Sequence, residues 1–261
     1  MPRSTINGTA IDLDGKEMIL DADQDTTITV DTDDRVDIKV AGTDTVHIDA
    51  SGIGVNINNP LYPLHVTEAS GGDTAAVFID GPTDGTSALF MGDSDDIDIG
   101  SIQYNHSSNY MSFRTNAAES MRIDSIGAVT KPLQPAFLVH ASGSQNDMTA
   151  GSTATAVLST EVYDQNNDFA SNTFTAPVTG KYFLVFTALF TDVQTEFTEI
   201  EIRINTSNRI YRLFIIPSIQ LSADGSIGDS FSVVADMDAS DTAIIQVTPV
   251  GGSDEMNIHS Y

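Results

Sequence analysis

The stretch Asn172-Thr-Phe-Thr-Ala-Pro-Val-Thr-Gly-Lys-Tyr-Phe-Leu184 decides how the C-terminal half of this chain folds. Pro177 fixes one backbone angle and Gly180 permits a positive one, so the pattern predicts a chain reversal there. The aromatic-rich run that follows, residues 182–190, predicts a long, deeply buried strand. We therefore expect the rest of the C-terminal half to pack on this strand.

Downstream residues alternate in the way that a strand with one buried face requires. Ile200, Ile202 and Ile204 alternate with the charged Glu199, Glu201 and Arg203, which predicts a half-buried strand. Further strands are expected at residues 136–141, 210–216, 230–234 and 243–247. The C-terminal part is therefore predicted to be all-β.

Residues 1–60 carry a second, shorter alternation. Its apolar members are Ile28/Val30, Val36/Ile38/Val40, Val46/Ile48 and Val55/Ile57, separated by turn-forming residues at 31–34, 41–44 and 50–52. Period-two alternation with tight turns predicts short strands. Each strand offers two or three aliphatic side chains, worth about 1.5–3 kcal/mol apiece, whereas backbone ordering costs about 1–2 kcal/mol per residue. We therefore expect three copies to wrap into a trimeric β-stalk.

Residues 61–131 predict a second β-rich module, with strands at 64–66, 76–79, 88–91, 97–99, 102–104 and 111–113. An internal repeat marks its two ends. Val46-His-Ile-Asp-Ala-Ser-Gly-Ile-Gly-Val55 is similar to Met121-Arg-Ile-Asp-Ser-Ile-Gly-Ala-Val129, and a proline-containing exit follows each copy. The predicted modules are therefore 1–60, 61–131 and 132–261.

Composition excludes several classes of function. The 261 residues include 11 basic and 37 acidic ones, a formal charge of −26 that repels a nucleic-acid backbone. The absence of cysteine excludes disulfides, thiolate zinc sites and cysteine nucleophiles. The longest near-apolar run, residues 182–190, is too short to span a bilayer, which takes about 20 residues. Neither nucleic-acid binding nor membrane insertion is expected.

Candidate metal ligands are weak in this sequence. Asp21-x-Asp23-x-Asp25 begins like a calcium loop, but Thr26 and Thr32 stand where that loop needs glycine and glutamate. Two interpretations stay open, a solvated acidic turn and a cation shared by three chains, and the acidic residues at 93–98 share this ambiguity. The five histidines are scattered, although His47 and His65 could meet their copies in a trimer. No catalytic motif is present, so neither an enzyme nor a cofactor is predicted.

Two resemblances add to this interpretation. Val46–Val66, with Pro63-Leu-His-Val66, resembles repeat units of bacteriophage tail fibres and related virion appendages, as does Gly92-Asp-Ser-Asp-Asp-Ile-Asp-Ile-Gly-Ser-Ile-Gln-Tyr-Asn-His106. The order Pro135-Ala-Phe137, Tyr163 to Phe169, and Phe174-x-x-Pro177-x-x-Gly180-x-Tyr182 is similar to the globular head of complement first component, subunit q.

The second resemblance implies a jelly-roll head that forms trimers. Its expected core and trimer residues are Phe137, Phe169, Phe174, Pro177, Gly180, Tyr182 and Phe186. That family carries an aromatic-Ser-Gly-aromatic pattern just past a segment like Asn257-Ile-His-Ser-Tyr261, which this sequence does not contain. The resemblance therefore predicts a shortened or trimmed last strand and leaves the closure of the jelly roll open.

Together these features predict a homotrimeric phage tail fibre or virion spike, assembled in the host cytoplasm. Its N-terminal region would join other virion proteins, and loops of the head would bind a host receptor, a glycan or a protein. The candidate loops are 143–153, 164–172, 192–196, 205–209 and 222–229, with Asn146, Asp147, Asn166, Asn167, Asn208 and Asp224 as candidate contacts. The alternatives are a purely structural decoration protein whose head drives trimerisation, and a polysaccharide depolymerase.

Overall fold

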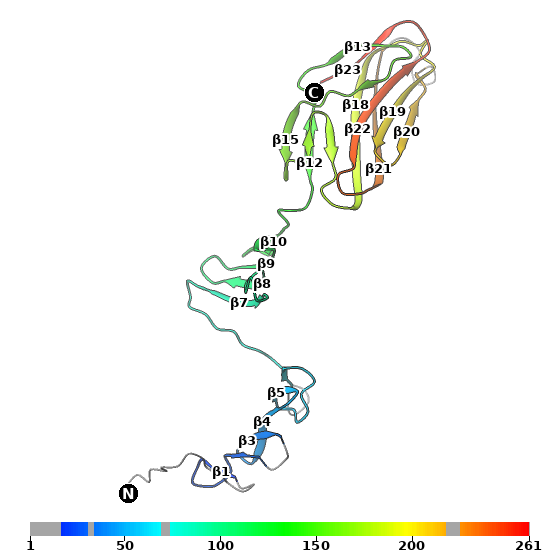
Figure 1. Ribbon diagram of the computed structural model, residues 1–261. Helices are drawn as coiled ribbons and strands as arrows, with labels where there is room; N and C mark the ends of the chain where they lie inside the picture. The colour runs from blue at the N-terminus through cyan, green and yellow to red at the C-terminus, as the bar shows by residue number, and fades with distance from the viewer. Residues whose placement is uncertain (1–16, 31–33, 69–73, 218–224, 261) are drawn as a thin grey trace. The chain divides into compact units, whose positions relative to one another are not determined.

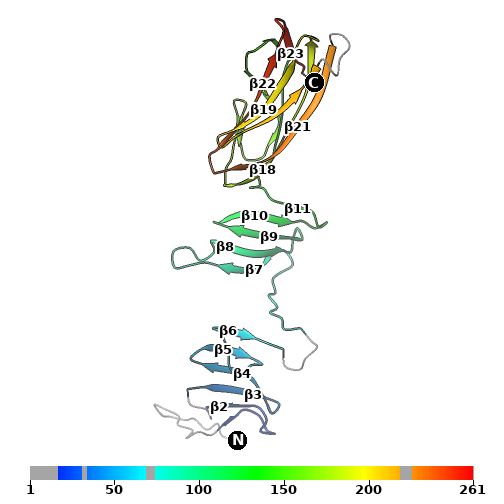
Figure 2. The same cartoon turned by 90° about the vertical axis from the view of Figure 1, so that its right-hand side faces the viewer.

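The computed structural model describes residues 17–30, 34–68, 74–217 and 225–260 (Figures 1 and 2). The described chain is all-β, as predicted, and it divides into two compact units, residues 1–81 and 82–261. Each unit is described by itself. The finer division into three modules stays a prediction, although the strand at residues 64–66 pairs within the first unit.

The first unit is one sheet of short strands that follow one another along the chain (Figure 2). Every neighbouring pair is antiparallel except the last, β5–β6, which is parallel. The strands are β1 (Met18–Ile19), β2 (Thr27–Thr29), β3 (Val36–Val40), β4 (Thr43–Asp49), β5 (Gly52–Val55) and β6 (Leu64–Val66).

Register aligns the apolar side chains of this sheet into two rows on one face. One row is Met18, Ile28, Ile38, Val46, Val55 and Val66, and the other is Val36, Ile48, Ile53 and Leu64. The alternation is thus confirmed, but this face is not buried within one chain, because Ile53 is 41% and Leu64 60% exposed. The opposite face is the buried one, and it carries Thr27, Thr29, Asp37 and His47.

The internal repeat forms a hairpin in both places, with an aspartate at the start of each turn. Asp49 accepts hydrogen bonds from the amides of Ser51 (2.7 Å) and Gly52 (3.2 Å). Asp124 likewise accepts from the amides of Ile126 (3.0 Å) and Ala128 (2.9 Å). An aspartate that fixes the turn after an aliphatic strand therefore explains the shared Ile-Asp sequence.

The second unit begins with a five-stranded antiparallel meander. Its strands are β7 (Thr86–Met91), β8 (Gly100–Asn105), β9 (Tyr110–Thr115), β10 (Ala118–Ile123) and β11 (Val129–Thr130). It repeats the pattern of the first sheet, with an apolar row of Leu89, Ile102, Phe113 and Met121 in register. Leu89 is 54% exposed, whereas Ser101 and Ser112 are buried.

Two strands predicted within residues 61–131 are wrong. Residues 76–79 form no strand and pair with nothing described, so Phe78 is 87% exposed. Residues 97–99 lie in a turn because the carboxylate of Asp93 binds the amides of Asp95 and Asp96 and closes the backbone. Gly92 permits that turn, since a side chain there would meet the backbone of Ile97.

The remainder of the second unit is a β-sandwich consistent with a jelly roll (Figure 1). One sheet has the order β13-β23-β18-β21, the other has β16-β17-β22-β19-β20 with β14 beside β22, and β12 pairs with β15. The strands are β12 (Phe137–His140), β13 (Gln145–Thr149), β14 (Ala154–Thr155), β15 (Thr160–Asp164), β16 (Phe169–Ala170), β17 (Thr173–Thr175), β18 (Gly180–Val193), β19 (Glu199–Thr206), β20 (Ile210–Ile215), β21 (Gly225–Met237), β22 (Thr242–Val250) and β23 (Glu255–Ile258).

The sandwich core lies between the two main sheets. Phe186 and Phe190 of β18 pack with Ile200 and Ile202 of β19 in one cluster. A second cluster holds most of the predicted core aromatics, with Phe137 stacked on Phe169 and Phe174 at about 5 Å between ring centroids and Tyr182 packed beside them. These residues therefore belong to the core of a single chain.

The strand that opened the sequence argument runs from Gly180 to Val193 and is only half-buried. Leu184, Phe186 and Phe190 point into the sandwich, whereas Phe183 is 70% and Val185 53% exposed. Gly180 does not adopt a positive φ, which corrects the predicted role of this glycine. The bend lies at residues 177–179, and Gly180 is already the first residue of the strand.

Candidate functional site

The predicted receptor-contact residues fall on different kinds of structure. Asn146 and Asp147 lie in β13, not in a loop, because this segment pairs with β23. A bulge between Gln145 and Met148 gives Asp147 a φ of 58°. The Asp147 amide donates to the Asn257 side chain at 2.9 Å, so its backbone is held in place.

The other candidates lie in turns. Asn166 and Asn167 follow β15, where the carboxylate of Asp164 binds the amides of Asp168 and Phe169 at 3.1 and 2.8 Å. Asn208 lies between β19 and β20, and its side chain donates to the carbonyl of Asp236 at 3.2 Å. The sixth candidate, residue 224, lies outside the described residues.

The structure does not gather these candidates into one site. The Asn208 turn lies where β22 begins, because Ser207 bonds to Thr242. The turn at residues 165–168 lies at the same end, since Thr175 bonds to Asp168 and pairs with Thr242. Asp147 lies at the opposite end, where Asn257 also bonds to Asp192 at the end of β18.

Sequence reasoning missed one polar cluster at the β22 end. The Asp236 carboxylate accepts from the Arg209 guanidinium at 2.6 Å and from the Tyr211 hydroxyl at 3.1 Å. Burial, together with the bond to Asp236, raises the pKa of Tyr211. Because these residues are up to 27 positions apart in the chain, only the pairing of β20 and β21 with their neighbours brings them together.

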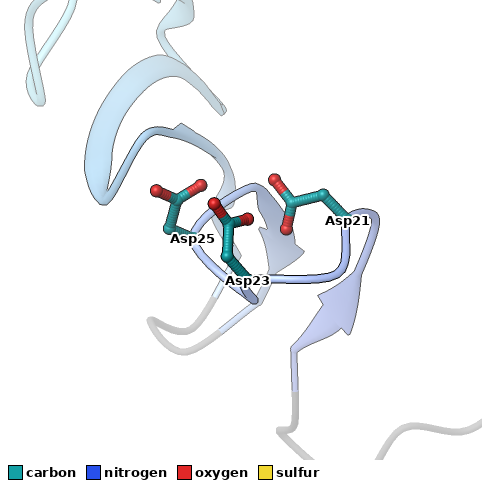
Figure 3. Close-up of side chains that lie close together, drawn as sticks. All are labelled: Asp21, Asp23 and Asp25. Atoms are coloured by element: carbon teal, nitrogen blue, oxygen red, sulfur yellow. The ribbon is translucent and has the colours of Figure 1, made fainter.

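The acidic turn at Asp21, Asp23 and Asp25 is compact (Figure 3). One oxygen of each carboxylate lies within 4.8 Å of the others, and among the described residues this is the group that could hold a metal ion. Hydrogen bonds from Thr26 lower the pKa of Asp21 and favour its charged form. The three side chains are exposed or half-buried, so both a solvated turn and a cation site fit them.

The histidines of the first unit do not form a cluster in one chain. His47 is fully buried, and its Nδ1 atom contacts the Asp37 carboxylate. His65 lies across Gly54 in the same register, and its Nδ1 atom accepts from the Leu61 amide at 3.4 Å. His47 is therefore engaged inside its own sheet, where Arg35 also pairs with Asp37 at 2.7 Å.

One predicted solvent-facing charge is buried. Glu201 of β19 is 4% exposed, because Arg203 and Arg212 pair with its two oxygens, the latter at 2.8 Å. The hydrogen bond from Arg203 lowers the pKa of Glu201. The outward side of this strand is thus covered by an ion-pair network and not by water alone.

The exposed side of β18 and β21 is an apolar patch, here named the outer face. Phe183 lies directly across from Val234, and Val185 lies two residues further along. These three side chains are 70%, 60% and 53% exposed. Beyond them, the hydroxyls of Thr187 and Ser230 bond at 2.9 Å. A contiguous exposed apolar patch on a rigid sheet is a feature of protein contact surfaces.

Comparison with known proteins finds a likeness among solved structures. No protein-family model matches the chain, and no curated protein matches it. Among solved structures, the chain is similar to the globular domain of the zebrafish complement 1qA protein, at 16% identity and a TM-score of 0.30. That match covers 46% of this chain and 97% of the other. The fold assignment therefore rests on the strand order and register described above.

Along the described residues, no helix has the length and apolar character needed to cross a membrane.

Proposed function

We propose that this protein is a homotrimeric virion appendage of the tail-fibre or spike type, which attaches to a host cell surface. The observation that carries the proposal is the exposure of apolar rows on both short-strand sheets. Side chains such as Ile53, Leu64 and Leu89 align in register across strands yet stay 41–60% exposed in one chain. Such rows are stabilised when other copies cover them.

Self-association would stabilise these sheets in two ways, by burying apolar side chains and by covering sheet edges. Each strand is short, from two to seven residues, and buries few apolar side chains within one chain. Among the described residues, the terminal strands of each sheet also leave an unpaired edge, which favours uncontrolled pairing with other chains. Three copies packed around a common axis would bury the apolar rows and restrict those edges.

The sandwich supplies the surface for receptor contact in this proposal. Its turns are rich in Asn, Asp, Ser and Gly, and they present polar groups at two ends of a rigid core. Polar turns on a rigid scaffold suit hydrogen bonding to sugar hydroxyls or to a protein receptor. Three such surfaces on one particle would bind with avidity although each alone is weak.

A structural decoration protein is the second candidate, and one observation favours it. The predicted contact residues do not converge, and Asp147 and Asn208 lie at opposite ends of the sandwich. An exposed apolar patch of the sandwich, the outer face, lies on a sheet and not in a loop. In this alternative the sandwich would hold the trimer together and contact no receptor.

Two measurements on the full chain test the proposal. Sedimentation at micromolar concentration should give the mass of three chains, and a stable monomer would exclude the trimer. Labelled protein should then bind cells of a susceptible host, and whole virus should compete for that binding. A trimer that binds no such cells would favour the decoration protein, whereas release of reducing sugar from the cell envelope would indicate a depolymerase.

A further inference from the structure

The outward side of the second sandwich sheet carries a short polar row across three neighbouring strands, β20, β19 and β22 (Figure 1). The isoleucines of β19 face the core, so the residues between them face outward. The strand register aligns Arg212, Arg203 and Gln246 on that side. Neighbouring Cβ atoms in such a row are about 5 Å apart. These three residues are named the arginine row.

The arginine row carries an excess of positive charge. Arg203 lies directly across from Arg212, and like charges in that position destabilise a sheet unless a counter-charge is present. Both guanidinium groups pair with the buried Glu201, which supplies a single negative charge for two positive ones. Glu199 lies on the same side of β19 but about 13 Å further along the strand. The row therefore attracts an anion locally, although the chain has 37 acidic and only 11 basic residues.

Arg212 has hydrogen-bond donors available for such an anion. Its Nη1 atom pairs with Oε1 of Glu201 at 2.8 Å, and its side chain is 45% exposed. Within the described ranges, its Nε and Nη2 atoms have no protein partner. These two atoms form one edge of the planar guanidinium, and that edge matches the two oxygens of a carboxylate.

Two neighbours of Arg212 add different chemistry on the same side of the sheet. Phe214 follows two residues later on β20 and is 49% exposed, so one aromatic ring is open to solvent beside the guanidinium. Gln246 is half-buried at the other end of the row, and its amide both donates and accepts. Its Oε1 atom has a long contact of 3.5 Å from Asn205, which leaves its N–H groups directed to other partners.

We propose that this surface binds a carboxylated sugar of a host-surface glycan, an inference that rests on the proposed attachment function and names its ligand class. Arg212 binds the carboxylate through its Nε and Nη2 atoms. Phe214 packs against the C–H groups of the sugar ring, and Gln246 donates to a hydroxyl. The receptor contact then lies on a rigid sheet and not only in the turns of the sandwich.

The surroundings of Arg212 favour a sugar over an acidic protein segment. A stable protein contact covers about 800 Å² on each partner and has apolar or aromatic anchors at its centre. Toward β22, however, the outward neighbours of Arg212 are the polar Arg203 and Gln246, and Thr248 follows on the same side. A ligand with one carboxylate and many hydroxyls matches that arrangement.

The test titrates the full chain with short oligosaccharides that contain glucuronic, galacturonic or N-acetylneuraminic acid. Each is matched by the same sugar with its carboxyl group reduced to an alcohol. Ligand-observed NMR measures binding at about 0.15 M salt, where remote acidic residues are screened beyond about 8 Å. We expect at least one carboxylated sugar to bind saturably, and its reduced form to bind at least tenfold more weakly.

Three variants locate the binding on the sheet. Arg212→Gln should weaken the carboxylated sugar at least tenfold. Arg212→Lys keeps the charge but lacks the planar fork, so it should weaken binding at least about threefold. Because Glu201 keeps Arg203 as a partner, both variants should fold, and thermal unfolding checks this. Lys181→Gln removes the same charge from an exposed position on the first sheet and should leave binding unchanged within about twofold.

Several outcomes would overturn the proposal. They are the absence of binding by all three carboxylated sugars, equal binding by a reduced form, and unchanged binding by the Arg212 variants. Displacement of the sugar by acetate at equal concentration would show that the surface takes a bare anion only. Tighter binding of an acidic peptide would assign the surface to a protein partner instead.

Binding to host cells separates this inference from the attachment function on which it rests. If the parent and Arg212→Gln bind the cells equally well, attachment stands and the sugar site is wrong. If carboxylated sugars bind through Arg212 but no cells are bound, the sugar site stands and the attachment function is wrong. A parallel loss of sugar binding and cell binding in Arg212→Gln, but not in Lys181→Gln, is the result that we expect.

Discussion

At the scale of single residues, the glycines differ sharply in what their positions require. Gly251 has a φ of 84°, and a Cβ there would lie 2.8 Å from the backbone nitrogen of Thr198. Gly180 lies in an extended strand, and a Cβ there would come no closer than 3.8 Å to the ring of Tyr182. The two residues thus form a matched pair in the same sandwich.

We expect Gly251→Ala to lower the free energy of unfolding by about 1–3 kcal/mol, because it combines positive-φ strain with a backbone clash. Gly180→Ala should change it by less than about 1 kcal/mol, and in the stabilising direction, since the unfolded chain loses freedom. Chemical denaturation of the two variants beside the parent measures the difference. Equal losses in both variants would contradict this interpretation.

The buried carboxylate of Asp37 makes the first unit sensitive to acid. Burial by itself would raise the pKa of Asp37, but hydrogen bonds from Arg35 and His47 outweigh it and lower the pKa. A carboxyl whose pKa is lower in the folded state stabilises the fold above its unfolded pKa of about 3.9. That contribution is lost as pH falls below about 4 and through the lowered folded-state pKa.

We therefore expect Asp37→Asn to destabilise the first unit by about 1–3 kcal/mol at pH 7, because it removes the buried carboxylate that binds Arg35 and His47. The difference between the parent and the variant should shrink as pH falls below about 4. Hydrogen exchange of amides in β3 and β4, at neutral and acid pH, measures this difference in stability. A difference that does not depend on pH would show that the carboxylate charge is not responsible.

At the scale of elements, the outer face of β18 and β21 distinguishes packing within a chain from packing between chains. Phe183 and Val234 lie in register and are mostly exposed, whereas Phe186 on the same strand is buried in the core. The exposed members can therefore be changed without opening the core. Ile210 at the start of β20, which is 46% exposed, supplies a control on the other sheet.

We expect the double change Phe183→Ser and Val185→Ser to raise the dissociation constant of self-association at least tenfold. Covering an aromatic or aliphatic side chain is worth about 1.5–3 kcal/mol, and about 1.4 kcal/mol corresponds to a factor of ten. Ile210→Ser should leave association unchanged. Sedimentation over a concentration series measures both variants, and unchanged association of the double variant would place the contact elsewhere.

Local sequence patterns predicted strands and turns well where a single residue type determines the local backbone conformation. Alternating aliphatic residues located β3, β4, β19 and β22, and the Ile-Asp repeat located two hairpins. The same patterns could not tell which face is buried, because in the first sheet the polar row with Asp37 and His47 is buried instead. That outcome depends on contacts across strands, which a linear pattern does not contain.

The candidate site was less predictable for the same reason. Asn146 and Asp147 have the composition of a loop, yet pairing with β23, which lies over 100 residues later, makes them part of a strand. The Arg209–Asp236 pair likewise arises from long-range strand order. Only a role that depends on local geometry, such as the turns after Asp49 and Asp124, leaves a signal in the sequence.

At the scale of the whole molecule, net charge opposes the association that the apolar rows favour. Each chain carries a formal charge of −26, so three copies repel one another strongly at low ionic strength. Salt screens this repulsion, with a Debye length of about 30 Å at 0.01 M and about 8 Å at 0.15 M. Hydrophobic contacts between the chains are not weakened by the same rise in salt concentration.

We therefore expect self-association to strengthen as sodium chloride rises from 10 to 300 mM. The fraction of trimer at fixed micromolar concentration, measured by sedimentation, should increase over that range. Replacing several exposed aspartates, among them Asp95 and Asp254, with lysine should make self-association less dependent on the salt concentration. Weaker association at high salt would instead indicate that ion pairs between chains dominate the interface.

The proposed attachment function makes a last prediction, which depends on the number of linked copies. If three weak receptor sites act together, a protein that stays monomeric should lose about 100-fold to 10,000-fold in apparent affinity for host cells. A loss near threefold would mean that each copy binds alone. The double variant Phe183→Ser and Val185→Ser supplies the monomer, provided that sedimentation shows it to be one, and Ile210→Ser supplies the trimeric control.

Fusing the monomeric variant to an unrelated trimeric coiled coil should restore binding to host cells, because the outer face would then serve assembly and not contact with the receptor. Failure of the fusion to restore binding would place Phe183 or Val185 in the receptor contact itself.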